Sequence, residues 1–174
     1  MTSGSDETAQ AAAVLRARSL FLREDNSFGC AETTQMALQD ALGLRDPDDG
    51  SASMALNGGV AYSGGVCGAI TGAALAVGRL AGLRIADHDR AKRCARELVD
   101  DLMEAFAAEF AATDCRQLVG YDLRTADQHA AFIASGIWRD TCMRQIEFAV
   151  RHVSPLADPV VWAARAGAPG RTEP

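Results

Sequence analysis

The sequence predicts an all-α protein: a compact, single-domain helical bundle with a glycine-rich loop before its central helix. Hydrophobic residues form 48% of the chain but aromatic residues only 6%, and alanine dominates the apolar share. This composition, poor in β-branched residues, favours closely packed helices over a β-sheet. The length of 174 residues is sufficient to bury a core as one domain without covalent cross-links.

The two ends of the chain differ in composition from its interior. Residues 1–7 and 167–174 are rich in Gly, Ser, Thr and Pro. Terminal segments of this kind are usually loose. We therefore expect flexible termini on either side of a single helical domain, residues 8–166.

Two helices are predicted in the first quarter of the chain. The apolar pattern predicts one helix over residues 11–23 and a second that opens at Asn26 or Ser27 and runs toward Gly43. Residues 45–51 combine Pro, Asp and Gly, which is typical of a turn.

The glycine-rich loop is the most unusual stretch of the sequence. It reads NGGVAYSGG over residues 57–65, between a short helix predicted at 52–56 and the central helix predicted at 66–80. We expect the loop to be irregular. In the central helix, small residues recur at every fourth position, namely Gly68, Gly72 and Ala76. Another element is therefore expected to pack very close to this helix.

A long helix is predicted next, capped by Asp87 or Asp89 and reaching about Phe110. Its apolar face follows helical spacing and comprises Ala91, Cys94, Leu98, Leu102 and Ala105. Shorter helices are predicted after it at residues 115–119, 126–134, 141–153 and 159–166. The long helix is thus expected to act as scaffold.

The charge pattern limits the possible partners. The formal charge is −6, with 17 basic residues scattered among 23 acidic ones, so no basic stripe could neutralise a phosphate backbone. We expect no nucleic acid partner. The apolar stretch 66–83 contains Arg79 and much Ala and Gly, which argues against a membrane span. Residues 1–10 show no secretory signal, so a cytoplasmic location is expected.

Four of the five cysteines are predicted at helix starts: Cys30, Cys67, Cys115 and Cys142. In a reducing compartment, such cysteines are ligands or reactive thiols more often than permanent disulfides. A helix start carries unpaired N–H groups and partial positive charge, which favour thiolate over thiol. We expect these four to converge on one site, whereas Cys94 lies on an apolar helix face and is expected in the core.

The motifs around these cysteines resemble one family. They read NSFGCAETTQMA around Cys30, GGVCGAITGAALAVG around Cys67, TDCRQLVGYDL around Cys115 and DTCMRQIEFAV around Cys142. The central motif, CGAITG, matches the central motif of that family. Over residues 11–153 the chain resembles the C_GCAxxG_C_C family, whose members are described as redox-active proteins with four characteristic cysteines.

The resemblance implies a redox site formed by the same four cysteines, with Cys94 outside it. A similar domain of split-Soret cytochromes is associated with an iron–sulfur cluster, while the chain lacks the C-x-x-C-H motif of haem attachment. We therefore expect the four thiolates to bind an iron–sulfur cluster of the 2Fe-2S type. Gly64, Gly65 and Gly68 would let backbone amides approach the cluster sulfides.

The expected function is electron transfer with a redox partner protein, or oxidoreductase chemistry on a small-molecule substrate; a homo-oligomer is compatible with the sequence. Two alternatives stay open. One is metal-free thiol–disulfide or sulfur-transfer catalysis, with Cys67 and Cys30 as the catalytic candidates. The other is a structural module with zinc held by the same four thiolates. No two cysteines form a C-x-x-C pair, which disfavours a zinc ribbon or a thioredoxin-type dithiol.

Other polar residues give weaker signals. His88, His129 and His152 form no helical metal pair and are interpreted as surface or capping residues. Glu32, about one helical turn from the expected site, is a candidate for proton transfer. Arg116 could stabilise an anionic centre, although its side chain equally suits solvent. The chain has no Ser-His-Asp order, phosphate loop or dinucleotide fingerprint.

Overall fold

The structure, a computed structural model, describes residues 3–167, and this part of the chain is all-α as predicted. Its helices are, in chain order, α1 (Ser3–Phe21), α2 (Cys30–Ala41), η1 (Ser51–Leu56), α3 (Gly68–Arg84), α4 (His88–Phe110), α5 (Cys115–Val119), α6 (Ala126–Ser135), η2 (Ile137–Arg139), α7 (Thr141–Val153), η3 (Ser154–Ala157) and α8 (Pro159–Ala166). Elements η1 to η3 are 3-10 helices. The β-pairing within these residues is limited to an isolated bridge between Val66 and Asp114.

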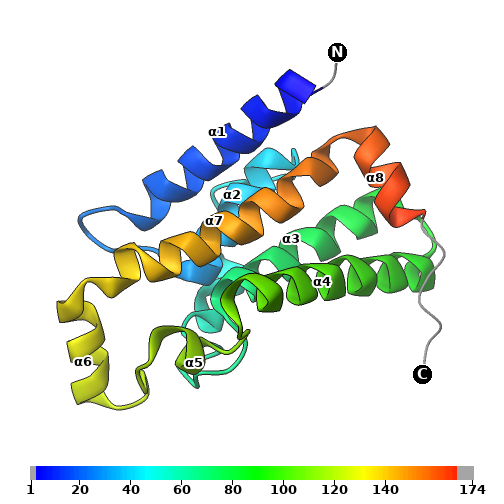
Figure 1. Cartoon of the computed structure of the whole chain (residues 1–174). Helices are drawn as coiled ribbons and strands as arrows, with labels where there is room; N and C mark the ends of the chain where they lie inside the picture. The colour runs from blue at the N-terminus through cyan, green and yellow to red at the C-terminus, as the bar shows by residue number, and fades with distance from the viewer. Residues whose placement is uncertain (1–2, 168–174) are drawn as a thin grey trace.

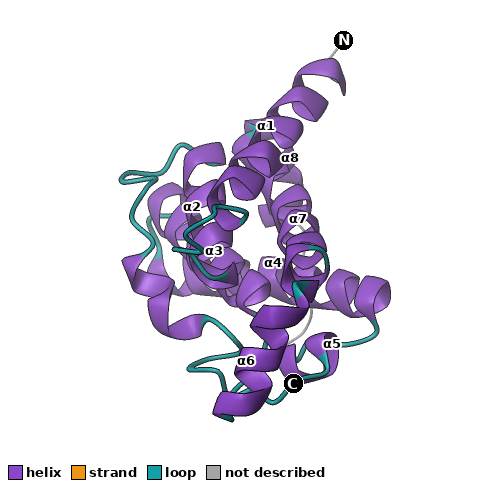
Figure 2. Ribbon diagram, turned by 90° about the vertical axis from the view of Figure 1, so that its left-hand side faces the viewer, coloured by secondary structure: helices purple, strands orange, loops and turns teal. Residues whose placement is uncertain are grey.

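The helices form a compact bundle with the short elements gathered at one end. Figure 1 shows α1, α7 and α4 running along the length of the molecule, with α5 and α6 at the lower left and α8 at the right. Helix α3 packs against both α2 and α4, and α1 packs against α2 and α7. Figure 2 views the bundle from the end that carries α5 and α6. The loops that precede α2, α3, α5 and α7 are therefore available to build a site at that end.

The core contains the face of α4 that the spacing predicted, with one difference. The buried residues of α4 are Ala91, Cys94, Leu98, Leu102 and Phe106. Phe106 occupies the last position in place of Ala105, and its ring packs against Phe110 and Phe148 at centroid distances of 4.6 and 5.7 Å.

Helix boundaries differ from the predicted ones mainly at the N-terminal ends. Helix α1 begins at Ser3, within the segment that we expected to be loose. The residue that caps α2 is Gly29 rather than Asn26 or Ser27. Asp87 caps α4 as predicted, because its side chain accepts the N–H of Arg90. The remaining terminal residues, 1–2 and 168–174, lie outside the described residues.

The central helix α3 begins at Gly68 and ends at Arg84, slightly beyond the predicted span. Its buried face is built from small residues, and Ala69, Ala73 and Ala76 have no exposed surface. No helix within residues 3–167 combines the length and apolar content needed to cross a bilayer.

Helices α2 and α3 make a backbone-close contact, as the glycine spacing predicted. A Cβ placed on Gly72 would overlap the carbonyl oxygen of Ala31, and one placed on Gly68 would overlap the sulfur of Cys30. Glycine is therefore needed at both positions, because any side chain would push α3 away from α2. The contact places the sulfur of Cys30 against Gly68, the first residue of α3.

The glycine-rich loop is more regular than we expected. Positive φ angles occur at five successive residues, namely Gly58 (65°), Gly59 (75°), Val60 (61°), Ala61 (51°) and Tyr62 (59°). These residues form one turn of left-handed backbone, which costs roughly 1–2 kcal/mol at each non-glycine residue. The turn is closed by hydrogen bonds from Gly64 N to Gly58 O and from Gly65 N to Gly59 O, 3.0 and 3.3 Å long.

The contact between α2 and α3 can be tested with glycines from a single helix. We expect Gly72→Ala to lower the free energy of unfolding by about 1–3 kcal/mol, because the added methyl group overpacks against the backbone of Ala31. Gly78 lies in the same helix, and a Cβ added there would have nothing within 4 Å. Gly78→Ala should therefore raise the free energy of unfolding by about 0.5–1 kcal/mol, because alanine favours the helix more than glycine does. Urea unfolding of both variants measures the difference, and equal effects would contradict the close contact.

Candidate functional site

Four cysteines stand at helix starts, as the sequence predicted. Cys30 is the first residue of α2, Cys67 is the cap residue before α3, Cys115 is the first residue of α5 and Cys142 is the second residue of α7. All five cysteines of the chain are free thiols. Cys67, Cys115 and Cys142 are buried, and Cys30 is partly buried.

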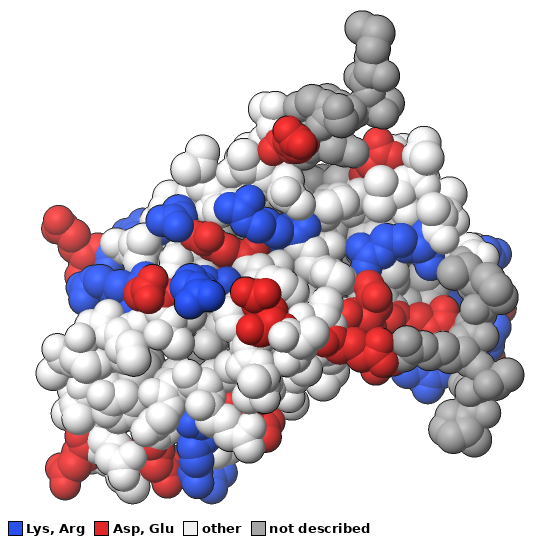
Figure 3. Space-filling model, viewed as in Figure 1, with Lys and Arg blue, Asp and Glu red and all other residues white. Residues whose placement is uncertain are grey.

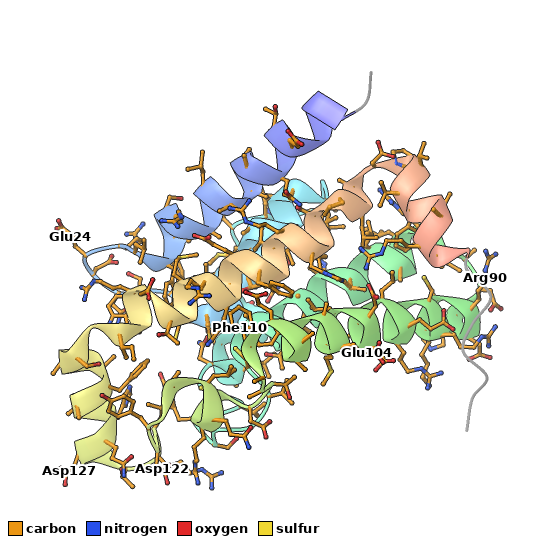
Figure 4. The ribbon with its side chains drawn as sticks, in the orientation of Figure 1. Glu24, Arg90, Glu104, Phe110, Asp122 and Asp127 are labelled. Carbon is orange, nitrogen blue, oxygen red and sulfur yellow. The ribbon has the colours of Figure 1, made fainter. Side chains whose placement is uncertain are left out.

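The structure brings these four residues together and leaves Cys94 elsewhere. Cys30, Cys115 and Cys142 line one cavity, and Cys67 is close enough to all three for their charges to affect its ionisation. The charged residues that affect Cys94 are instead Glu97 and Arg90. Figure 4 shows Arg90 at the opposite end of α4 from Phe110 and far from the α5 and α6 end.

Cys67 and Cys115 are held on two paired backbone segments. The isolated bridge places Val66 opposite Asp114. On either side of it, Cys67 N donates to Thr113 O at 2.8 Å and Cys115 N donates to Gly65 O at 2.7 Å. The end of the glycine-rich loop is thus tied to the start of α5, so the two cysteines cannot move apart without breaking these bonds.

Cys30 is positioned by a cap that comes from another part of the chain. Gly29 has no side chain to cap α2, and Asn57 performs this role: its Oδ1 accepts the N–H of Ala31 at 2.9 Å. The Asn57 Nδ2 donates to Glu32 Oε2 at 2.8 Å, and the same carboxylate oxygen accepts the N–H of Gly29 at 2.9 Å. The sulfur of Cys30 lies 3.9 Å from Asn57 Oδ1. Asn57 therefore links the glycine-rich loop to the first turn of α2.

The glycines near the site have different roles. Burial has the largest effect on the Cys30 thiol and raises its pKa, whereas the nearby backbone N–H groups of Gly58, Ala31 and Gly68 each lower it. Gly64 and Gly65 instead donate their N–H groups to carbonyls within the loop. The expectation of amide donors at the site thus fits Gly68, whereas Gly65 acts through its carbonyl, which holds Cys115.

Helix α7 contributes a second contact to the cysteine group. Gln145, one turn after Cys142, is 3% exposed, and its Oε1 lies 3.5 Å from the sulfur of Cys67. The thiol of Cys67 donates this hydrogen bond in the protonated state. The bond connects the start of α3 with the start of α7.

A cavity of about 210 Å³ opens next to the cysteines. Its walls are largely apolar and include five aromatic side chains: Phe21, Phe28, Tyr62, Phe132 and Trp138. The rings of Tyr62 and His129, both lining the cavity, pack against each other at a tilt of 42° with centroids 4.9 Å apart. Trp138 is 4% exposed, and its Nε1–H has no hydrogen-bond acceptor. An unmet buried donor of this kind costs about 1–3 kcal/mol.

One family accounts for this arrangement of cysteines. The family model described as "Putative redox-active protein (C_GCAxxG_C_C)" matches residues 28–155, a segment that contains all four clustered cysteines. The chain belongs to the C_GCAxxG_C_C family. Comparison with curated proteins and with solved structures found no match.

The four clustered cysteines of this C_GCAxxG_C_C protein are thiols rather than thiolates when no metal is bound. Burial raises the pKa of Cys67 well above its ordinary value, and repulsion from Cys30, Cys115 and Cys142 raises it further. Burial likewise raises the pKa of Cys115 to about 12, with a contribution from Cys30. The pKa of Cys142 is also raised well above its ordinary value, chiefly by burial.

The expectation that helix starts would favour thiolate is therefore wrong for the metal-free site. Even at Cys30, where several N–H groups favour the anion, burial is the largest effect and the pKa is raised. Desolvation of a charge outweighs the partial charges of a helix start. A positive charge placed among these sulfurs would reverse the balance.

The other candidate residues either line the cavity or form ion pairs elsewhere. His129 lines the cavity, although we had interpreted it as a surface or capping residue. Glu32 is buried and lines the cavity as well, but its carboxylate is already hydrogen-bonded. Arg116 forms an ion pair with Asp122 at 2.9 Å, and His152 pairs with Asp101 at 3.0 Å.

Sequence reasoning missed Asn57, Gln145 and Trp138. Each acts on the site through a contact distant in sequence, for which no local pattern exists.

Among residues 3–167, no group of three or more His, Cys, Asp and Glu side chains is arranged to hold a single metal ion.

The cap provided by Asn57 can be tested by truncation. We expect Asn57→Ala to lower the free energy of unfolding by about 1–3 kcal/mol, because it leaves the N–H of Ala31 without its acceptor and removes one of the two hydrogen bonds to the Glu32 carboxylate. Asp140, which precedes α7, makes no side-chain cap bond. Asp140→Ala should therefore lower the free energy of unfolding by less than Asn57→Ala does. Chemical denaturation measures both, and a larger loss for Asp140→Ala would refute the assigned role of Asn57.

The raised pKa of Cys115 predicts a pH dependence of stability. Between the ordinary value of 9.0 and about 12, the unfolded chain loses the thiol proton while the folded protein keeps it. The stabilisation is thus complete below pH 9 and falls as pH rises toward 12, by about 1.4 kcal/mol per pH unit for one thiol. Serine does not titrate in this range. Unfolding of the metal-free Cys115→Ser protein between pH 8 and 11 should show a shallower fall than the parent, and parallel curves would count against the shift.

Proposed function

We propose that the protein is a redox protein that binds an iron–sulfur cluster, of the 2Fe-2S type, through Cys30, Cys67, Cys115 and Cys142. The observation that carries this proposal is the convergence of four free thiols from four separate helix starts. Membership of a family of redox-active proteins supports it. Iron–sulfur clusters are held by four cysteine thiolates of this kind, which need not be close in sequence.

The residues around the thiols fit such a group on three counts. Four soft sulfur donors are the preferred ligands of iron–sulfur clusters. The backbone N–H groups of Gly58, Ala31 and Gly68 lie near enough to the sulfur of Cys30 to lower its pKa against the larger effect of burial, and hydrogen bonds to sulfur are one means by which proteins set cluster potentials. Trp138, whose buried indole N–H lacks an acceptor, lines the same cavity.

The chain's own residues would bind, orient and shield the group. The four thiols would lose their protons and act as ligands, while the cluster would supply the exchange of single electrons. Asn57 and the glycine-rich loop hold Cys30, and the paired segments hold Cys67 and Cys115. The aromatic walls restrict water at the cysteine end, because Trp138 and Phe132 are buried.

Metal-free thiol–disulfide or sulfur-transfer chemistry is the second candidate, with Cys67 and Cys30 as the catalytic pair. A nucleophilic cysteine usually has a lowered pKa and a cationic or helix-start environment that stabilises its thiolate. Here burial raises the pKa of both thiols, and no Lys or Arg lines the described cavity. These observations support the cluster over the dithiol. The third candidate is a structural module in which the same thiols hold zinc without turnover. Metal analysis distinguishes this candidate from the cluster.

The proposed setting is the reducing cytoplasm, where free thiols persist and clusters are assembled on them. The proposed partner is either a redox protein or a small-molecule substrate that exchanges electrons with the cluster, and the enzyme class would then be an oxidoreductase. Self-association of the chain is compatible with this proposal.

The cluster can be tested by replacing each cysteine in turn with serine. Serine keeps the size of the side chain but loses the soft donor, so each of Cys30→Ser, Cys67→Ser, Cys115→Ser and Cys142→Ser should lose most of the bound iron and sulfide. Cys94→Ser is the control and should keep both. Iron, zinc and acid-labile sulfide are measured on protein purified without oxygen, together with visible absorption.

Three other outcomes would replace the proposal. Colourless protein that contains zinc in all but the four variants would indicate the structural zinc module. Metal-free protein in which two cysteines are essential for thiol chemistry and three are dispensable would indicate the dithiol mechanism. Loss of metal only in Cys94→Ser would show that the wrong cysteine group had been selected.

A further inference from the structure

The cavity next to the cysteines has two chemically different ends. Cys115 and Cys142 are 6% and 9% exposed and mark its inner end. Tyr62 and Ile133 are 43% and 41% exposed and mark its mouth. Three cysteines, Cys30, Cys115 and Cys142, line the inner part, whereas the rest of the lining extends outward over α1, the turn before α2 and α6. A small molecule could therefore enter at the mouth and rest beside the cysteine group.

Aromatic rings dominate the walls between the two ends. The chain has six Phe, two Tyr and two Trp, and half of them line this one cavity: Phe21, Phe28, Tyr62, Phe132 and Trp138. Phe21 and Trp138 meet edge to face at 5.4 Å, so the rings already pack against one another. A pocket walled in this way favours a flat ring, which stacks on aromatic faces and edges.

The charges around the cavity favour a neutral ligand. No Lys or Arg is among the described residues that line it, and Glu32 already accepts hydrogen bonds from Gly29 and Asn57. Arg139 and Arg23 lie over the rings of Trp138 and Phe28, 4.2 and 5.8 Å from the ring centroids, but neither lines the cavity. An anion inside would therefore find no counter-charge in the lining and would lose its hydration. Figure 3 shows that the surface at the lower left, where α6 lies, is largely uncharged, with acidic and basic side chains at its edges.

The polar groups in the walls define what the ring must carry. Trp138 lines the cavity and carries a buried N–H without an acceptor. His129 lies half-buried beside Tyr62 and has a ring nitrogen that can donate. A ligand with carbonyl oxygens and no charge would supply the missing acceptors. Quinones combine a flat neutral ring with two carbonyl oxygens.

We propose that the aromatic-walled outer part of this cavity binds a neutral, planar molecule of the quinone class. The inference rests on the proposed function in one respect, because the cluster at the inner end would make such a ligand a redox partner. The binding itself depends on the aromatic walls and on Trp138. It is therefore expected both in cluster-loaded and in metal-free protein.

The fluorescence of Trp138 provides a direct measure of binding. The other tryptophan, Trp162, lies on α8 outside the cavity, so Trp162→Phe leaves Trp138 as the reporter. The probe is 2,3-dimethyl-1,4-naphthoquinone, whose two substituted ring carbons block addition of thiols. Saturable quenching is expected. Added Ile133→Asp, which places a charge at the mouth, should weaken binding about tenfold or more.

A matched control and a second variant complete the test. Leu83, 71% exposed on α3, does not line the cavity, so Leu83→Asp should leave the affinity unchanged. Trp138→Phe keeps a ring but removes the N–H, and calorimetry should then show about fivefold weaker binding. Equal effects of the two aspartate variants would overturn the site, and an unchanged affinity in Trp138→Phe would overturn the quinone assignment.

Iron and sulfide analysis of the same preparations separates this inference from the proposed function. Saturable quenching in protein without iron and sulfide would uphold the ligand site while refuting the cluster. Iron and sulfide in protein that shows no saturable quenching would refute the ligand site while upholding the cluster.

Discussion

The contact between α2 and α3 is the constraint on which the rest of the site depends. At Gly68 and Gly72 the two backbones approach so closely that no Cβ fits between them. This places Cys30, the first residue of α2, beside the first residue of α3, with Cys67 immediately before it. A single extra methyl group would therefore separate two helices and two thiols together. Packing and chemistry share the same few atoms here, so the site tolerates little change in its scaffold.

Burial and local dipoles act in opposite directions on the clustered cysteines. Helix starts and the amides near Cys30 favour the anion, yet burial raises the pKa of that thiol and of the other three. Proximity adds to this effect, because each additional thiolate repels the others. A metal-free protein therefore keeps its protons, and a cationic centre would replace them. The same arrangement that disfavours a nucleophilic thiol suits a metal ligand.

The sequence predicted most of the helices and the four helix-start cysteines, because apolar spacing and small-residue stripes are local signals. It could not predict how Cys30 is held, since its cap comes from Asn57, far along the chain. Nor could it predict the left-handed turn, because Val60, Ala61 and Tyr62 are residues that normally avoid positive φ. The aromatic cavity also escaped prediction, because its rings come from α1, the turn before α2, the glycine-rich loop, α6 and η2. Such features arise from tertiary contacts that override local preference.

The protonated state of the buried thiols has a consequence for the order of assembly in the cell. Uncharged thiols can be buried as small apolar groups, so this chain can complete its fold before any metal is present. Zinc fingers behave differently, because their small cores form only around the ion. Under the proposed function, maturation would be a late event: iron and sulfide would enter a finished protein through the mouth flanked by Tyr62 and Ile133, and protons would leave as the ligands form. Newly made protein could thus wait, folded and uncoloured, for its supply of iron.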